Sequence, residues 1–507
     1  MPQQDNANLY AFYQNAFPAD RSTTLLTTVT GNTFSYADAE RCSAQIANCL
    51  LNLGAQIGDR VTVQVEKSPE ALCLYLACLR AGLVFHPLNT AYQANELEFF
   101  LTNAEPTIVV CDGKGEELLS SLAPKPRVKQ VLTLNSDGSG SLMEGAAECS
   151  GTLDPVARKG DDLAALLYSS GTTGQPKGIM LTHANLASNT ATLVKAWDFT
   201  EQDCLLHALP IFHVHGLFVA LGCVLGSGAS MRWLDRFDTK DVLASLPGCT
   251  VMMGVPTYYT RLLATPAFDR ASCESVRLFI SGSAPLLADT FAEFEQRTGH
   301  AILERYGMTE TSMNTSNPLQ GERRPGTVGM PLPGVDLRVV DGEQQELPPG
   351  EPGDLQVRGP NVFPGYWRLP DKTAEDFTAD GYFNTGDQAV IDADGYVSIV
   401  GRAKDMIISG GLNIYPKEIE LLLDDMDGVA ECAVIGVPHP DFGESVVAII
   451  VPAASGAPDA ESVVSYARRQ LANFKVPKQV HFVDELPRNA MGKVQKKLLR
   501  ERYSAAD

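Results

Sequence analysis

One segment of the sequence has the composition of an anion-binding loop. Residues Tyr168–Gly178 read Y-S-S-G-T-T-G-Q-P-K-G and directly follow an apolar run that is typical of a buried strand. Glycine lets the backbone approach an anion closely, and successive N–H groups with Ser and Thr hydroxyls can surround phosphate oxygens. Lys177 adds a positive charge, although no G-K-[ST] sequence closes a Walker A loop. Composition alone favours phosphate binding and a flexible linker about equally.

Five further segments carry residues that suit nucleotide chemistry. They are S-G-S-A-P (Ser281–Pro285), E-R-Y-G-M-T-E (Glu304–Glu310), Y-F-N-T-G-D (Tyr382–Asp387), G-R-A-K-D (Gly401–Asp405) and P-R-N-A-M-G-K (Pro487–Lys493). Together with the glycine-rich segment, and in the same order, these motifs resemble the acyl-adenylate-forming superfamily, which includes acyl-CoA synthetases, luciferases and adenylation domains. The resemblance covers essentially the whole chain.

The resemblance implies a site for ATP and Mg²⁺. It makes Glu310 the carboxylate that binds the metal and places Thr309 on the α-phosphate. It stacks Tyr306 on adenine and lets Asp387, with Arg402 nearby, accept the ribose hydroxyl protons. The residues that it places on ATP or AMP are Ser169, Ser170, Gly171, Thr172, Thr173, Gly174, Lys177, Gly282, Ser283, Ala284, Tyr306, Gly307, Met308, Thr309, Asp387 and Arg402.

The same resemblance makes Lys493 the catalytic lysine, which acts with Glu310, Thr309 and His213. A lysine near the end of a chain is normally a surface charge, but the P-x-x-x-x-G-K context matches the family's motif. Related bacterial synthetases are silenced by lysine acetylation at this site. Because acetylation removes the charge, we expect a protein lysine acetyltransferase acting on Lys493 to inactivate the enzyme.

The implied reaction has two steps and uses ATP, Mg²⁺ and coenzyme A. A carboxylate attacks the α-phosphate and pyrophosphate leaves; the thiol of CoA then attacks the acyl-adenylate and expels AMP. Positioning and charge neutralisation carry such phosphoryl chemistry. In the family, the small domain rotates between the steps about a hinge, here Lys404. Gly410 and Gly411 would approach the pantetheine arm, and Lys475 is a candidate CoA contact that could equally be solvated.

Two arginines and a histidine pair bear on which acid is used. His213 and His215 could be read as a metal pair, but no third ligand is obvious, and His213 matches the family position beside the reacting carboxylate. Arg261 lies on a predicted helix after G-V-P-T and could bind a second carboxylate bidentately. Arg277 is a second candidate, and Ser283, in the loop from Ser281 that lines the family's substrate pocket, is a further predicted contact of the acid. For either arginine, an outward-facing, solvated side chain is the simpler interpretation.

The segments around these residues resemble the malonate-activating branch of the family. We therefore predict an AMP-forming malonate–CoA ligase that rejects acetate and partly tolerates methylmalonate, since an unpaired buried arginine costs more than an extra methyl group. A CoA ligase for another short-chain or aromatic acid stays open, as does a freestanding adenylation enzyme that loads a carrier protein. A non-catalytic nucleotide-binding protein is a third class, which Glu310, Asp387, Arg402 and Lys493 disfavour.

The elements that must position these residues alternate between strand-like and helix-like segments. That alternation predicts α/β layers, and a small β-subdomain follows about Pro333. The last hundred residues predict a separate, mobile α+β domain. We expect a large AMP-binding domain at 1–402, a hinge at 403–405 and a small domain at 406–507 that carries the catalytic lysine. The fold class is thus α/β plus α+β.

Composition limits the partners. The chain of 507 residues has a formal net charge of −21, which argues against nucleic-acid and anionic-membrane binding. Its 11 cysteines fit no zinc pattern and are expected to be buried free thiols in a reducing compartment. The N-terminus lacks the features of a signal or transit peptide, and the longest apolar stretch is too short to span a bilayer. We expect a cytoplasmic protein.

Overall fold

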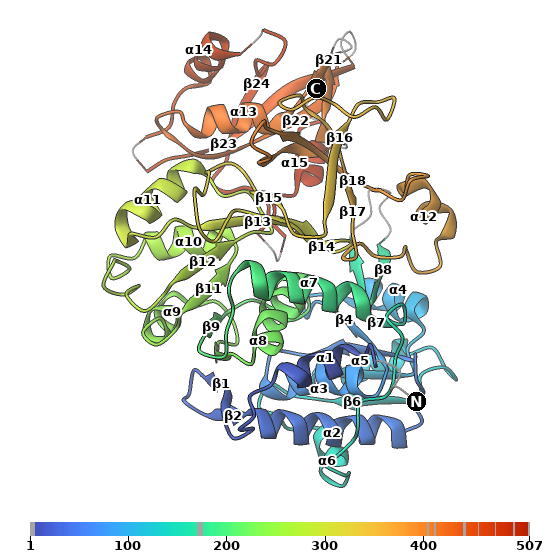
Figure 1. Cartoon of the computed structure of the whole chain (residues 1–507). Helices are drawn as coiled ribbons and strands as arrows, with labels where there is room; N and C mark the ends of the chain where they lie inside the picture. The colour runs from blue at the N-terminus through green and yellow to red at the C-terminus, as the bar shows by residue number, and fades with distance from the viewer. Residues whose placement is uncertain are drawn as a thin grey trace.

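A computed structural model of the chain describes residues 6–169, 176–402, 405–409, 412–439, 443–454, 456–471, 473–489 and 492–504. Two large sheets and a small β-sheet form the N-terminal part, and a compact unit at the C-terminal end lies on top of it (Figure 1). Several predicted residues fall outside the described ranges: Ser170, Gly171, Thr172, Thr173 and Gly174 of the phosphate segment, the hinge residue Lys404, and Gly410 and Gly411.

The first large sheet has six strands in the order β6-β5-β3-β4-β7-β8 and is parallel except for β8. Its strands are short and almost wholly apolar, as expected of parallel strands covered on both faces. Their bounds are β3 (Arg60–Gln64), β4 (Val84–Pro87), β5 (Ile108–Cys111), β6 (Gln130–Thr133), β7 (Leu163–Ser169) and β8 (Lys177–Thr182).

The second large sheet has nine strands in the order β15-β14-β13-β12-β11-β9-β10-β1-β2. Strands β13 to β1 along this order run parallel, and the outermost strands on each side are antiparallel. The bounds are β1 (Thr24–Thr28), β2 (Thr33–Ser35), β9 (Cys204–His207), β10 (Ser230–Trp233), β11 (Val251–Gly254), β12 (Leu278–Ser281), β13 (Leu303–Met308), β14 (Ser312–Ser316) and β15 (Met330–Pro331).

Side chains along these strands alternate between the two faces of the sheet, and each face contributes to a different hydrophobic core. In β9, Leu205 joins the large core shared by the two sheets, whereas Leu206 packs with the helices on the outer face. Helix α3 lies in the shared core and is buried from Ala71 to Arg80. The shared core also takes residues from α1 (Leu9–Ala16), α2 (Tyr36–Asn52), α6 (Ser141–Ala147), α7 (His183–Ala196), the π-helical turn η1 (His215–Ala220) and α8 (Leu221–Ser227); α3 spans Pro69–Arg80.

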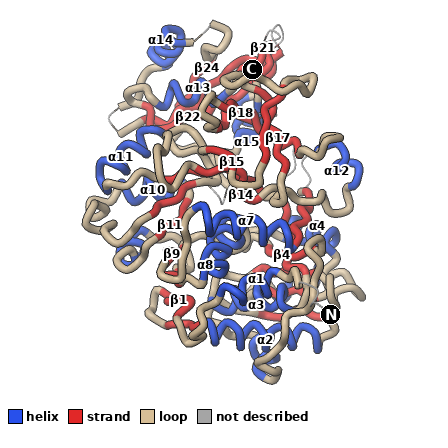
Figure 2. The backbone as a smooth tube through the Cα atoms, viewed as in Figure 1, coloured by secondary structure: helices blue, strands red, loops and turns tan. Residues whose placement is uncertain are grey.

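Outer helices cover the remaining faces (Figure 2). One group of helices packs on the second sheet and another group packs on the first sheet. The large part therefore has alternating helix and strand layers. On the second sheet these are α9 (Thr239–Ser245), α10 (Pro256–Leu263) and α11 (Ala288–Thr298); on the first they are α4 (Ala94–Ala104) and α5 (Glu116–Leu122).

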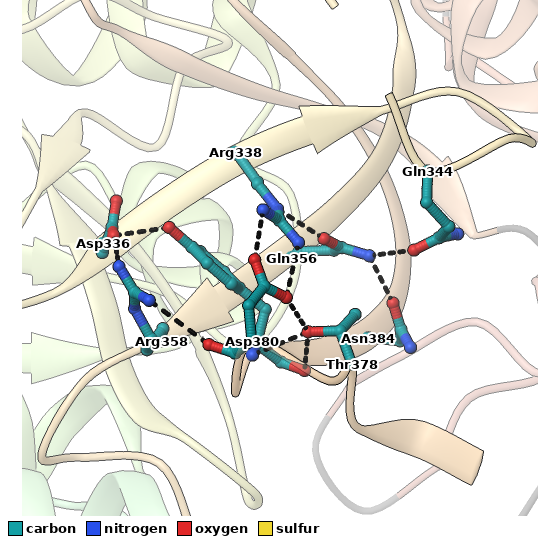
Figure 3. Close-up of polar contacts among 9 residues, drawn as sticks. Asp336, Arg338, Gln344, Gln356, Arg358, Thr378, Asp380 and Asn384 are labelled. Atoms are coloured by element: carbon teal, nitrogen blue, oxygen red, sulfur yellow. Dashed lines mark hydrogen bonds and ion pairs between the residues drawn. The ribbon is translucent and has the colours of Figure 1, made fainter. Parts of the chain in front are cut away.

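A four-stranded antiparallel sheet forms the predicted β-subdomain. A polar network ties its strands together (Figure 3): Arg338 donates from Nε to Gln356 Oε1 at 2.7 Å and pairs with Asp380, and Gln356 Nε2 donates to Asn384 Oδ1 at 2.7 Å. Asn384 lies in the Y-F-N-T-G-D motif, so this network holds the strand that carries Asp387. The elements are β16 (Asp336–Val340), β17 (Gly353–Arg358), α12 (Pro370–Asp376), β18 (Phe383–Ile391) and β19 (Val397–Arg402).

The C-terminal unit is an α+β domain with its own core. Glu420 is buried in it and accepts from Lys496 at 2.5 Å and from the Val434 backbone N–H at 2.9 Å. This pairing ties the last helix to the sheet. The elements are β20 (Ile407–Ser409), β21 (Leu412–Ile414), α13 (Pro416–Asp424), β22 (Val429–His439), β23 (Gly443–Pro452), α14 (Ala460–Gln470), β24 (Gln479–Phe482) and α15 (Lys496–Tyr503). The architecture confirms the predicted fold class.

None of the helices in the described part of the chain has the length and apolar character that crossing a lipid bilayer requires.

Candidate active site

The predicted motifs converge at one edge of the nine-stranded sheet. Strands β9, β11, β12 and β13 are parallel, so their carboxyl ends meet there. In doubly wound sheets, ligands bind in the crevice outside these ends. His207, Gly254, Ser281 and Met308 are the last residues of the four strands, and the segments that follow them carry the predicted acid and nucleotide residues.

The loop after β12 holds Ser283 in a strained conformation. Its φ is +72°, which a residue with a side chain rarely adopts and which is often found at functional sites. Ser283 Oγ lies 3.2 Å from His215 Nδ1, so this loop contacts the segment after β9. Gly282 lies directly before it, and a side chain there would overlap the Arg305 guanidinium at 2.5 Å. The loop therefore brings Ser283 next to His215 and Gly282 next to Arg305.

The turn after β13 presents Glu310 and Thr309. Glu310 is buried, and Ser169 Oγ, at the end of β7, donates to its carboxylate at 3.3 Å. The turn is tight at Gly307, where an added Cβ would lie 1.9 Å from Ser312 O. The phosphate segment and the predicted metal carboxylate are thus adjacent, although they are more than a hundred residues apart in the sequence.

Tyr306 and Asp387 form a second contact between motifs. The Tyr306 hydroxyl donates to Asp387 Oδ2 at 2.5 Å, and Asp387 is buried. Asp387 stands opposite Arg402 in the antiparallel register of β18 and β19. The three residues that the resemblance places around the nucleoside therefore lie together, at the junction between the nine-stranded sheet and the β-subdomain.

Lys493 lies at the tip of a short hairpin that reaches the large domain. The backbone of Asn489 and Lys493 pairs at 2.9 Å, and a Cβ added at Gly492 would lie 3.5 Å from Thr257 Oγ1 in α10. Burial, together with the positive charge of Lys493, lowers the pKa of His213 to about 4. The structure thus brings Lys493 from the C-terminal domain to His213, and His213 is neutral at physiological pH.

Two other predicted lysines have acidic partners. Lys177 Nζ lies 3.6 Å from Asp376 Oδ2 in α12 and 4.4 Å from the centre of the Tyr366 ring. Lys475, the candidate CoA contact, pairs with both carboxylate oxygens of Glu418 at 2.7 Å. Lys475 is therefore held within the small domain, where it pairs with α13.

The two predicted acid-binding arginines have different surroundings. Arg261 is exposed on α10, one helical turn after Thr257, which faces the Lys493 hairpin. Arg277 precedes β12, at the opposite end of the strand from Ser281, and forms a bidentate ion pair with Asp203 at 2.8 and 2.9 Å. Arg261 therefore stays a predicted acid ligand, whereas Arg277 already has a carboxylate partner.

Sequence reasoning missed Arg305, which lies inside the E-R-Y-G-M-T-E motif. Its side chain is 3% exposed, and within the described part of the chain its Nε and Nη2 atoms have no hydrogen-bond partner. Burial lowers its pKa to about 10, so it still carries a charge at neutral pH. Residues two apart in a strand point to the same face, and Leu303, two residues before Arg305 in β13, faces the shared core. This spacing is the one signal in the sequence that Arg305 points inward.

Family profiles match both parts of the chain. The AMP-binding enzyme profile matches residues 14–367, and that of the AMP-binding enzyme C-terminal domain matches residues 418–493. The chain belongs to the AMP-binding enzyme family. The predicted superfamily is therefore confirmed.

Named relatives in this family act on different acids. The chain is 37% identical to a mitochondrial malonate–CoA ligase of Mus musculus over 92% of this chain and 86% of the relative. It is also 37% identical to a feruloyl-CoA synthase of Amycolatopsis sp. over 93% of this chain and 94% of the relative.

A solved structure in the family has a similar overall arrangement. ATP-bound MatB from Rhodopseudomonas palustris is 53% identical, with 99% of both chains covered, and superimposes with a TM-score of 0.96. Apo MatB from the same organism, with the same identity and coverage, superimposes with a TM-score of 0.86. The overall arrangement of the chain is thus closer to that of the ATP-bound protein.

The Glu310 carboxylate fits a Mg²⁺ site. In the described ranges, no three His, Cys, Asp or Glu side chains form a metal-binding cluster. Mg²⁺ is commonly held by one or two carboxylates together with substrate phosphates and water. The buried Glu310 carboxylate beside the phosphate segment provides such a ligand.

Proposed function

We propose that this AMP-binding enzyme is an ATP-dependent malonate–CoA ligase that produces malonyl-CoA, AMP and pyrophosphate. The observation that carries the choice of acid is Arg305, a buried guanidinium with unsatisfied donors in β13, level with the carboxyl end of β12. The relationship to MatB and to malonate–CoA ligases supports the same conclusion. We also propose methylmalonate as a poorer substrate.

Arg305 has open donors that a substrate could satisfy. A buried polar donor without a partner costs on the order of 1–3 kcal/mol, and more when the group is charged. A ligand carboxylate would satisfy Nε and Nη2 together, because a guanidinium binds carboxylates bidentately. Malonate has one carboxylate to react and a second to pair with Arg305. Acetate has only the first and would leave Arg305 unpaired, so we expect it to be rejected.

The residues have separate roles in the first step. Lys493, at the tip of its hairpin, would bind the α-phosphate and stabilise the charge that develops there. Neutral His213 would lie beside the reacting carboxylate without repelling Lys493, since its lowered pKa keeps it uncharged. Thr309 would donate to the α-phosphate, while Asp387 and Tyr306 hold the nucleoside. When bound at Glu310, Mg²⁺ supplies neutralisation of the phosphate charge.

The second step requires a different arrangement of the small domain. We propose the boundaries 1–402, 403–405 and 406–507, with Lys404 at the hinge, which agree with family matches that end at 367 and resume at 418. Gly410 and Gly411 remain proposed contacts of the pantetheine arm. Lys475 is a weaker candidate for CoA because Glu418 neutralises it.

We also propose Lys493 as an acetylation site for a protein lysine acetyltransferase. Its side chain is exposed, and its charge is the feature that the α-phosphate would require. Acetylated protein that retains full adenylation would contradict this. The cytoplasmic location stays a prediction, and the murine relative is named as mitochondrial.

Pyrophosphate release with ATP and Mg²⁺ across a panel of acids tests the proposed function. We expect release with malonate, weaker release with methylmalonate, and at least a hundredfold lower kcat/KM for acetate, because a buried unpaired donor set costs on the order of 3 kcal/mol. Malonyl-CoA should form when CoA is added. Comparable kcat/KM for malonate and acetate, or preference for an aromatic acid such as ferulate, would overturn the substrate. Transfer only to a phosphopantetheinyl carrier would indicate a freestanding loading enzyme.

A further inference from the structure

We propose that Lys67 and His207 are positioning residues that fix the segment 208–216, which carries His213 and His215, against the acid pocket. The sequence motifs assign no role to either residue. Lys67 follows β3 of the six-stranded sheet, whereas His207 ends β9 of the nine-stranded sheet. The two side chains therefore join the two large sheets. The inference rests on the proposed ligase activity but not on malonate being the acid.

Lys67 is a buried amine with a complete set of acceptors, and burial lowers its pKa well below the usual range while Asp235 opposes that shift. Its Nζ atom lies 2.8 Å from His207 Nδ1, 2.8 Å from His207 O and 2.6 Å from Leu234 O. An ammonium group has three donors, and there are three acceptors here. The same Nζ lies 4.2 Å from the centre of the Trp233 ring, which adds a cation–π contact. Lys67 therefore fixes both the side chain and the backbone of His207.

The Gly216 carbonyl settles which ring nitrogen of His207 carries the proton. His207 Nε2 lies 3.0 Å from Gly216 O, and because a carbonyl oxygen only accepts, Nε2 carries the proton and donates. In the neutral ring, Nδ1 is then the acceptor for Lys67. Burial, reinforced by the nearby Lys67, lowers the pKa of His207 well below its usual range, so the ring stays neutral in this role.

The bond from His207 to Gly216 closes the segment that begins directly after His207. The segment is compact: a Cβ on Gly216 would lie 2.0 Å from Pro210 O, so only glycine fits, and Leu217 N–H donates to His213 O at 2.9 Å. The π-helical turn η1 starts at His215, and such turns are frequently found at functional sites.

The closed segment sets the wall of the acid site. His213 lies near Lys493, and His215 contacts Ser283. A shift of this segment would therefore displace the groups beside the reacting carboxylate while leaving the Tyr306–Asp387 side of the nucleotide site untouched. The expected signature is a change in the KM of the acid at an unchanged KM of ATP.

Two substitutions at His207 separate the two bonds of the ring. An asparagine amide occupies roughly the place of Nδ1, so His207→Asn keeps an acceptor for Lys67 and loses the donor to Gly216. A glutamine amide reaches the place of Nε2, so His207→Gln keeps that donor. Steady-state kinetics with the acid that wild type uses best should show the acid KM raised at least tenfold in His207→Asn. The KM of ATP should stay within twofold, and His207→Gln should recover to within about threefold of wild type.

Two further variants keep the test decisive. Lys67→Met removes the donor to Nδ1 and should raise the acid KM in the same selective way, even if His207→Asn fails to fold. His183→Asn is the matched control, because His183 is a buried histidine whose Nδ1 accepts from Leu9 N–H at 3.0 Å. It should leave the acid KM unchanged. Equal loss in His207→Asn and His207→Gln, or loss confined to kcat or stability, would overturn the inference. A wild type inactive with every acid would instead contradict the proposed function.

Discussion

The two ends of the nine-stranded sheet differ in how their buried charged group is paired: Asp203 at the amino end has a partly exposed partner, whereas Arg305 at the carboxyl end has open donors. At the amino end, Arg277 and Asp203 form a bidentate pair, and Thr250 Oγ1 donates to the same carboxylate at 2.6 Å. Arg277 also donates to the Trp197 carbonyl at 3.0 Å. At the carboxyl end, Arg305 is more deeply buried, yet its Nε and Nη2 have no partner in the described part of the chain.

A charged group with a structural role differs from one with a binding role in whether its hydrogen bonds are complete within the protein. A buried ion pair with its hydrogen bonds complete is self-sufficient, and removing one partner is what destabilises it. A buried arginine with open donors is costly to the free protein, and a ligand that supplies a carboxylate recovers that cost on binding. Function is therefore expected where the hydrogen bonding is incomplete.

The largest expected effect is at Arg305. Arg305→Met should lower kcat/KM for malonate by on the order of a thousandfold, because losing a buried charge pair with the substrate costs about 2–5 kcal/mol. The unfolding free energy should be unchanged or higher, since an unpaired buried charge is removed. Initial rates and urea denaturation measure the two quantities. A destabilised variant that retains malonate activity would reverse the comparison between the two ends.

Arg277 should behave in the opposite way. Arg277→Met strands Asp203 and should lower the unfolding free energy by about 1–3 kcal/mol, while kcat/KM per folded molecule stays within about threefold. Burial raises the pKa of Asp203, but Arg277 and Thr250 outweigh it and hold that pKa below its usual value. The stabilisation is therefore present at neutral pH and is lost as the pH falls through the lowered pKa, so the difference between variant and wild type should shrink in acid. A constant difference would mean that the ion pair is not its source.

Arg261 should show the smallest effect and is the alternative to Arg305 as the acid ligand. Because its side chain is exposed, Arg261→Ala should change kcat/KM for malonate by less than about threefold and the unfolding free energy by less than about 0.5 kcal/mol. The same assays apply. A large, malonate-specific loss would make Arg261 the acid ligand and weaken the case for Arg305.

The parts that were predictable from the sequence are those in which a short contiguous segment carries the information. The apolar runs Thr107–Cys111 and Leu163–Tyr168 predict strands close to β5 and β7. The helix-like segments Ala37–Leu53 and Ala71–Ala81 predict helices close to α2 and α3. The motifs ending in Glu310, Asp387 and Lys493 each hold their residues on one turn or strand end. Their grouping follows from the family resemblance, which the profile matches confirm.

The surroundings proposed for the carboxylic acid substrate were not predictable, because they are assembled from segments that are distant in the sequence. Arg261, Arg277 and Arg305 are chemically identical, and their roles depend on which face of a helix or strand is covered and on which carboxylates lie nearby. Lys67 and His207 are 140 residues apart and belong to different sheets. Local sequence determined the elements and the nucleotide motifs, because backbone preference and periodicity act over a few residues. Tertiary packing alone decided which buried cations were satisfied, because burial and pairing depend on the whole fold.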